Sequence, residues 1–85
     1  MQFLDVREED EWRIGHIEGA VHIPMEAVPD HLDRLERDRP VVVVCTSGRR
    51  SSLVAAYLSC VGFNVHNMNG GLEAWAAEGL PLVKA

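Results

Sequence analysis

Four consecutive valines, Val41–Val44, run directly into Cys45, and this junction constrains the fold more than any other stretch of the chain. A valine run is typical of a strand that is buried on both faces, as the strands of a parallel sheet are. The apolar residues 53–58 that follow favour a helix. Cys45 is therefore predicted where a buried strand ends and a helix is about to begin, which is where ligands bind in open α/β sheets.

The residues after Cys45 favour an anion-binding loop. They are Thr46, Ser47, Gly48, Arg49, Arg50 and Ser51. The first N–H groups of a helix have no partner within it and carry partial positive charge, and Gly48 permits backbone dihedrals that other residues avoid. A free thiol has a pKa of about 8.5, and such surroundings lower it to roughly 3.5–7.5. We therefore predict a reactive thiolate at Cys45; the alternative is a cysteine that only packs as a small apolar residue.

Composition narrows the function classes. The chain has 85 residues, eight basic and thirteen acidic, for a net charge of −5, which argues against nucleic acid and anionic membrane surfaces as partners. No stretch predicts a membrane span or a signal peptide, so we expect a cytoplasmic protein. Two cysteines predict neither a disulfide framework nor a zinc site, and His16 and His22 match no common metal spacing, so no metal or other cofactor is expected.

Apolar patterning and turn residues predict strands over 3–6, 20–23, 41–44 and 63–68, and helices over 8–13, 29–36, 51–61 and 72–78. The helix 51–61 is expected to bury Val54, Tyr57, Leu58 and Val61, with Cys60 as a packed thiol. Strands that alternate with helices imply an α/β fold. We expect one domain over residues 1–85, with a parallel sheet of about four short strands and helices on both faces.

Four blocks of the sequence resemble a single-domain rhodanese. They are Leu4–Arg7, Gly15–Ala20, Cys45–Ser51 and Gly70–Trp75, and they occur in that family's order over nearly the whole chain. Each block is weak alone, but together they are specific. The resemblance implies a three-layer rhodanese-like domain and a sulfurtransferase. Its loop cysteine would take sulfur from thiosulfate or another persulfide, hold it as a persulfide, and pass it to a thiol or cyanide.

The resemblance also assigns roles in the loop. Cys45 would be the nucleophile, and the N–H groups of residues 46–51 would hold the persulfide sulfur. Arg49 and Arg50 would attract an anionic donor; the alternative is a solvated basic helix start that binds nothing.

Three further residues match the family's other blocks. Asp5 and Arg7 match an Asp-x-Arg block, and Glu18 lies in a His-x-x-Gly-Ala block. We expect Arg7 and Glu18 to pair and to support the surroundings of the loop. The alternative is an ordinary surface ion pair, which would contribute less than about 1 kcal/mol.

The chain departs from the family in one respect. Rhodanese domains usually carry another strand and helix before the Leu-Asp-Val-Arg block, whereas this sequence begins almost at that block. We expect the missing strand to leave a sheet edge uncovered, which would favour self-association.

Two other function classes compete with the sulfurtransferase. The first is a cysteine-dependent phosphatase or arsenate reductase, some of which, by family resemblance, share the rhodanese fold with a longer loop. Such phosphatases have five residues between cysteine and arginine, whereas four separate Cys45 from Arg50, and a phosphoryl group needs a wider ring of donors than one sulfur atom. A non-catalytic interaction module is the other class, and the presence of Cys45 argues against it. A relay that takes sulfur from a protein persulfide lies between the two, and Arg49 and Arg50 suit either donor.

Overall fold

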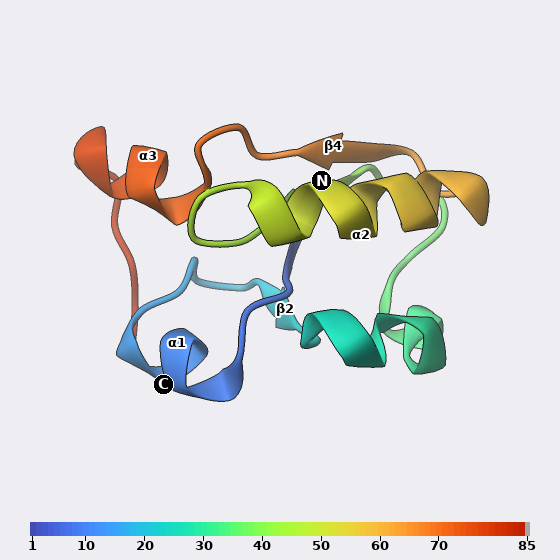
Figure 1. Cartoon of the computed structure of the whole chain (residues 1–85), viewed down its shortest axis with the longest axis horizontal. Helices are drawn as coiled ribbons and strands as arrows, with labels where there is room; N and C mark the ends of the chain where they lie inside the picture. Colours follow the sequence, from blue (N-terminus) through green and yellow to red (C-terminus); the bar gives the residue numbers. More distant parts are fainter. Residues whose placement is uncertain (85) are drawn as a thin grey trace.

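The computed structural model describes residues 1–84 as a four-stranded sheet and its covering helices (Figure 1). In chain order the elements are β1 (Gln2–Asp5), α1 (Glu9–Ile14), β2 (Val21–His22), the 3₁₀ helices η1 (Met25–Asp30) and η2 (Leu32–Arg34), β3 (Val41–Val44), α2 (Arg49–Cys60), β4 (Val65–Asn67) and α3 (Gly71–Ala77). The strand order is β2-β1-β3-β4, and each neighbouring pair is parallel. No helix within these residues is long and apolar enough to cross a membrane.

The valine strand lies inside the sheet and packs on both of its faces. Val41 and Val43 are fully buried in a core cluster that includes Val54 and Leu58 of α2. Val44 points to the other face and packs in a second cluster with Leu72 of α3. This alternation follows from the two-residue period of a strand. The predicted α/β architecture, with a parallel sheet of four short strands and helices on both faces, is confirmed.

The carboxyl ends of three strands meet at one edge of the sheet. Asp5 at the end of β1 lies opposite Val44, and Val43 lies opposite Asn67 at the end of β4. Figure 1 shows α1, α3 and the N-terminal end of α2 gathered at the same end of the molecule. Cys45 follows β3 directly, so it begins the connection from this edge of the sheet to α2.

The predicted helix over residues 29–36 is wrong. Two short 3₁₀ helices, η1 and η2, occupy this region, and Pro29 lies inside η1 rather than in the first turn of a longer helix. Proline has no N–H to donate, so it interrupts regular helical bonding there. Leu35 already has an extended backbone, and both it and Val28 reach the core.

Helix α2 buries Val54 and Leu58 as predicted, and Val61 packs partly buried against the core, but the buried stripe is turned toward Ser51 and Ala55. Its buried residues are Ser51, Val54, Ala55 and Leu58, which follow the i, i+3, i+4, i+7 pattern of one helix face. Tyr57 is 36% exposed and Cys60 is exposed, so their predicted burial is wrong. Ser51 therefore stands at the head of the apolar stripe, directly beside Cys45. Strand β4 is also shorter than the predicted 63–68 strand.

Candidate active site

Cys45 is almost fully buried, and polar groups converge on its sulfur. Its side chain is 1% exposed. The N–H of Gly48 donates to Sγ over 3.0 Å, and the N–H of Ser51 donates over 3.4 Å. The thiol in turn lies 3.4 Å from the Ser51 hydroxyl oxygen, to which it donates. The loop after β3 thus curls around one sulfur atom.

Gly48 makes this curl sterically possible. It has a φ of +98°, in the left-handed region that favours glycine, and it is the N-cap of α2. The turn aims the Gly48 N–H back at the cysteine while the helix begins. Ser51 then adds an N–H from the first turn of α2, where such groups have no partner within the helix. The predicted role of Gly48 in the turn is confirmed.

The surroundings of Cys45 act on its pKa in opposite directions. Burial raises the pKa because it removes water from the thiolate. The N–H groups of Ser51, Gly48 and Ser47 lower it by hydrogen bonding to the charged form, and so does the Ser51 hydroxyl when its proton turns from Asn67 to the thiolate; together they outweigh burial. The pKa of Cys45 therefore lies below the ordinary value of a thiol.

Asn67 at the end of β4 supports the loop, and sequence reasoning missed it. Its Oδ1 accepts a short hydrogen bond from the Ser51 hydroxyl, and its Nδ2 lies 3.4 Å from the Gly48 carbonyl oxygen, to which it donates. Asn67 thus holds both residues that donate N–H groups to Cys45. Its position in the sequence could have indicated this role, because Asn67 is the last residue of a strand parallel to β3 and the ends of such strands lie at the same sheet edge as Cys45.

Helix α3 fixes the start of the loop from the other side. The N–H of Leu72 donates to the Cys45 carbonyl oxygen over 2.8 Å, and the N–H of Glu73 donates to that of Thr46 over 3.0 Å. Gly71 has a φ of +58°, and a Cβ there would overlap both carbonyl groups. Only glycine lets the first turn of α3 approach the loop this closely.

Glu11 of α1 pairs with Arg50, a contact that the sequence did not reveal. Arg50 donates to the two carboxylate oxygens of Glu11 over 2.8 and 2.9 Å, and the Thr46 hydroxyl donates to one of them over 3.3 Å. The Arg50 hydrogen bonds are the largest cause that lowers the pKa of Glu11, from 4.5 to about 2. The pair also raises the pKa of Arg50. Glu11 is therefore a carboxylate at neutral pH, and it neutralises Arg50.

Arg49 differs from its neighbour because it is exposed and unpaired. Within residues 1–84 its guanidinium forms no ion pair and no hydrogen bond. It lines an open hollow of about 550 Å³ together with Ser47, Arg50 and Leu53. The first turn of α2 therefore presents one free cation beside the cysteine loop.

Asp5 and Arg7 form a buried pair beside the loop. Asp5 is 1% exposed, and its two carboxylate oxygens accept from the Arg7 guanidinium over 2.9–3.1 Å. Arg7 also donates to the Gly15 carbonyl oxygen over 2.6 Å, so the pair connects the end of β1 with the end of α1.

The predicted pair between Arg7 and Glu18 is wrong. Glu18 is exposed, and no ion pair joins it to Arg7 within the part of the chain that the structure describes. Asp5 takes the guanidinium instead because it lies two residues away on the same strand end. Arg7 and the loop residue Thr46 line one hollow, and Asp5 holds the Arg7 guanidinium.

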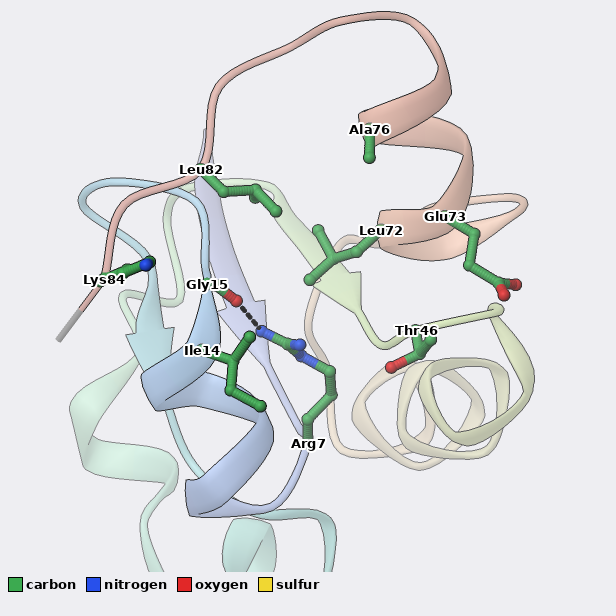
Figure 2. Close-up of a pocket in the computed structure, with 9 residues that line it drawn as sticks. All are labelled: Arg7, Ile14, Gly15, Thr46, Leu72, Glu73, Ala76, Leu82 and Lys84. Carbon is green, nitrogen blue, oxygen red and sulfur yellow. Dashed lines mark hydrogen bonds between the residues drawn. The ribbon is translucent and has the colours of Figure 1, made fainter.

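A second hollow of about 430 Å³ lies between the end of α1, α3 and the C-terminal segment (Figure 2). Figure 2 shows Leu72, Leu82 and Ile14 turned toward it, with Thr46 at its rim. The lining also includes Arg7, Gly15, Glu73, Ala76 and Lys84. Thr46 is thus the one loop residue that borders this hollow.

The two histidines considered as ligands stack on Trp12. The ring centroids of Trp12 and His16 are 3.5 Å apart, and those of Trp12 and His22 are 4.7 Å apart, with nearly parallel planes. His16 also contacts the Trp12 carbonyl oxygen and His22 the Arg7 carbonyl oxygen, each at 2.8 Å. Both imidazoles therefore help to pack α1 against the sheet, as predicted for structural histidines.

Comparison with known proteins identifies the family. The profile of the rhodanese-like domain matches residues 1–78. The chain is 41% identical over 81 residues to a protein of Allochromatium vinosum named "Sulfurtransferase", covering 94% of this chain and 76% of that one. It is 40% identical over 73 residues to the "Thiosulfate sulfurtransferase GlpE" of Pseudomonas entomophila, covering 85% and 67% of the two chains.

Comparison with solved structures leads to the same family as the sequence comparison. A crystal structure of a rhodanese-related protein from Thermoplasma volcanium superimposes with a TM-score of 0.92 at 36% identity, covering 96% of this chain and 82% of that one. The fold, the four sequence blocks and the family profile lead to one assignment: the chain belongs to the rhodanese-like domain family.

Proposed function

We propose that this protein is a rhodanese-type sulfurtransferase that carries sulfane sulfur as a persulfide on Cys45. The Cys45 thiolate would attack the outer sulfur of thiosulfate, form a new S–S bond and release sulfite, which leaves with the electron pair of the broken S–S bond. A low-molecular or protein persulfide would react in the same way and leave as a thiolate. Cyanide or an acceptor thiolate would then attack the outer sulfur and restore the Cys45 thiolate.

The convergence of N–H groups on Sγ is the observation that carries this proposal. Gly48 and Ser51 donate to the sulfur over 3.0 and 3.4 Å, and their positions are held by Asn67. Preorganised donors of this kind stabilise a thiolate and a persulfide anion without reorganisation during the reaction. The names of the relatives support the same reaction class.

Thr46, Ser47, Gly48, Arg49, Arg50 and Ser51 would form the loop that binds the persulfide and the donor. Asp5 and Arg7 would support it by holding α1 against the sheet edge. Such a reaction needs a free thiol, and both Cys45 and Cys60 are free. We therefore place the protein in the reducing cytoplasm.

Steady-state transfer of sulfur from thiosulfate to cyanide tests the proposal, with an aryl phosphate as the substrate of the competing phosphatase. The Cys45→Ser variant should lose sulfur transfer and keep its fold by circular dichroism. The Cys60→Ser variant is the matched control, because Cys60 is exposed at the far end of α2, and it should keep the activity. Sulfur transfer that survives in Cys45→Ser, or turnover of the aryl phosphate alone, would contradict the proposal.

A further inference from the structure

Two arginines, Arg49 and Arg50, line the hollow beside the cysteine loop, but a carboxylate neutralises the charge of one of them. Glu11 binds Arg50 through both carboxylate oxygens, and about a third of each side chain remains exposed. Arg49 is exposed and forms no ion pair within residues 1–84. The two arginines that line the hollow, taken together with Glu11, therefore have a combined charge near +1 rather than +2.

An apolar side chain completes the lining. Leu53, one helical turn after Arg49, is 67% exposed and lines the same hollow. Exposed leucine beside a single cation fits a ligand that has one negative charge and a carbon substituent. Thiosulfate is a small dianion without such a substituent, so it makes no contact with the leucine, and a single cation compensates only half of its charge.

We propose that Glu11 is a specificity-determining residue that, together with Leu53, directs the site toward monoanionic organic sulfur donors, such as organic thiosulfonates and organic persulfides. The inference rests on the proposed function. The Glu11 carboxylate neutralises the positive charge of Arg50 by pairing with its guanidinium. It also accepts a hydrogen bond from the Thr46 hydroxyl, so it contacts the cysteine loop at two residues. The donor discriminated against is the doubly charged one.

The chemistry is the same for both donor classes. An organic thiosulfonate R–SO₂–S⁻ and the Cys45 thiolate give the Cys45 persulfide anion and the sulfinate R–SO₂⁻. Thiosulfate and the thiolate give the same persulfide and sulfite. In each case one S–S bond forms at Cys45, and the S–S bond between the outer sulfur and the oxidised sulfur of the donor breaks. The leaving sulfite or sulfinate keeps the electron pair of the broken bond. Only the charge and the substituent of the donor differ.

The test compares kcat/KM for thiosulfate with kcat/KM for benzenethiosulfonate, both with cyanide as acceptor. The ratio of the two values cancels any general damage to Cys45, because both donors form the same persulfide. Glu11→Gln is the informative variant, since glutamine at this position still accepts the hydrogen bond that the Glu8 N–H donates over 2.9 Å at the start of α1. Asp10→Asn is the matched control, because it removes the same charge from the same helical turn.

Glu11→Gln should raise the thiosulfate-to-benzenethiosulfonate ratio about three- to tenfold, since it frees one positive charge near a dianion. Asp10→Asn should change the ratio less than about twofold. The double variant Glu11→Gln/Arg50→Gln removes both charges of a neutral pair, so its ratio should return to within about twofold of the wild type. Leu53→Ser should lower kcat/KM for benzenethiosulfonate more than for thiosulfate.

The outcomes separate the two proposals. Turnover of both donors with a ratio that Glu11→Gln leaves unchanged or lowers would overturn the role of Glu11 and leave the sulfurtransferase standing. A double variant whose ratio departs from the wild type as far as that of Glu11→Gln would also overturn it. No turnover of either donor by the wild type would contradict the proposed function itself.

Discussion

The N–H of Leu72 donates to the carbonyl oxygen of Cys45 over 2.8 Å, so the first turn of α3 holds the residue that follows β3. Gly71 permits this approach, because a side chain there would meet the carbonyl groups of Cys45 and Thr46. Two helix N-termini therefore build the site: N–H groups at the start of α2 bind the sulfur of Cys45, and the N–H of Leu72 at the start of α3 binds its backbone carbonyl.

Gly71→Ala should destabilise the protein and impair sulfur transfer. A left-handed backbone costs a residue with a side chain roughly 1–2 kcal/mol. Overlap with the loop carbonyls adds about 1–3 kcal/mol. Gly79→Ala is the control, because Gly79 has a φ of +77° but no atom lies within 4 Å of the position that a Cβ would take there. Denaturant unfolding should show the larger loss for Gly71→Ala; equal losses would show that the close approach of α3 is unimportant.

Ser51→Ala should raise the pKa of Cys45, because the variant removes the hydroxyl that hydrogen-bonds to the thiolate. The pH dependence of alkylation by iodoacetamide measures this pKa, and its midpoint should move to higher pH. Ser52→Ala is the control, since the Ser52 hydroxyl bonds only the Arg49 carbonyl oxygen at 2.8 Å. An unchanged midpoint in Ser51→Ala would assign the stabilisation of the thiolate to the backbone alone.

Arg49→Gln should raise KM for thiosulfate about three- to tenfold, because it removes the unpaired cation beside the loop. The effect should shrink as ionic strength increases. Arg13→Gln removes the same charge from the exposed end of α1 and should leave KM nearly unchanged. Equal KM values for Arg49→Gln and the wild type at low salt would exclude Arg49 from donor binding.

The Glu11–Arg50 pair should stabilise the fold in a pH-dependent way. Folding lowers the pKa of Glu11 from 4.5 to about 2, so its contribution is fully present above pH 4.5 and is lost as the pH falls toward 2. Because 32% and 34% of the two side chains are exposed, we expect a contribution of only about 1 kcal/mol. Urea unfolding of the wild type and Glu11→Gln should show a stability difference that disappears between about pH 5 and pH 2. A constant difference across this range would contradict the role of the pair.

Much of the fold and the centre of the site could be predicted because they depend on neighbouring residues. The valine run marks a strand buried on both faces, and Gly48 marks the turn that follows it. The rest depends on contacts between distant segments. Glu11 lies 39 residues before Arg50, in an acidic run that also suits a helix start or a solvated face, so nothing local marked it as a partner.

The wrong predictions have the same origin. Asp5 lies two residues from Arg7 and pairs with it locally, whereas the position of Glu18 relative to Arg7 depends on the path of the chain after α1, which leaves Glu18 exposed. The burial of Ser51 in place of Tyr57 depends on the rotation of α2 about its axis, which its packing on the sheet sets. The same packing leaves Cys60 exposed at the end of α2.

The mass of the Cys45 peptide after treatment with thiosulfate tests the central claim most directly. Sulfur captured by the ring of N–H groups should add the mass of one sulfur atom to that peptide, cyanide should remove it, and the Cys60 peptide should stay unmodified. Sulfur found on Cys60 instead, or on neither cysteine, would contradict the account.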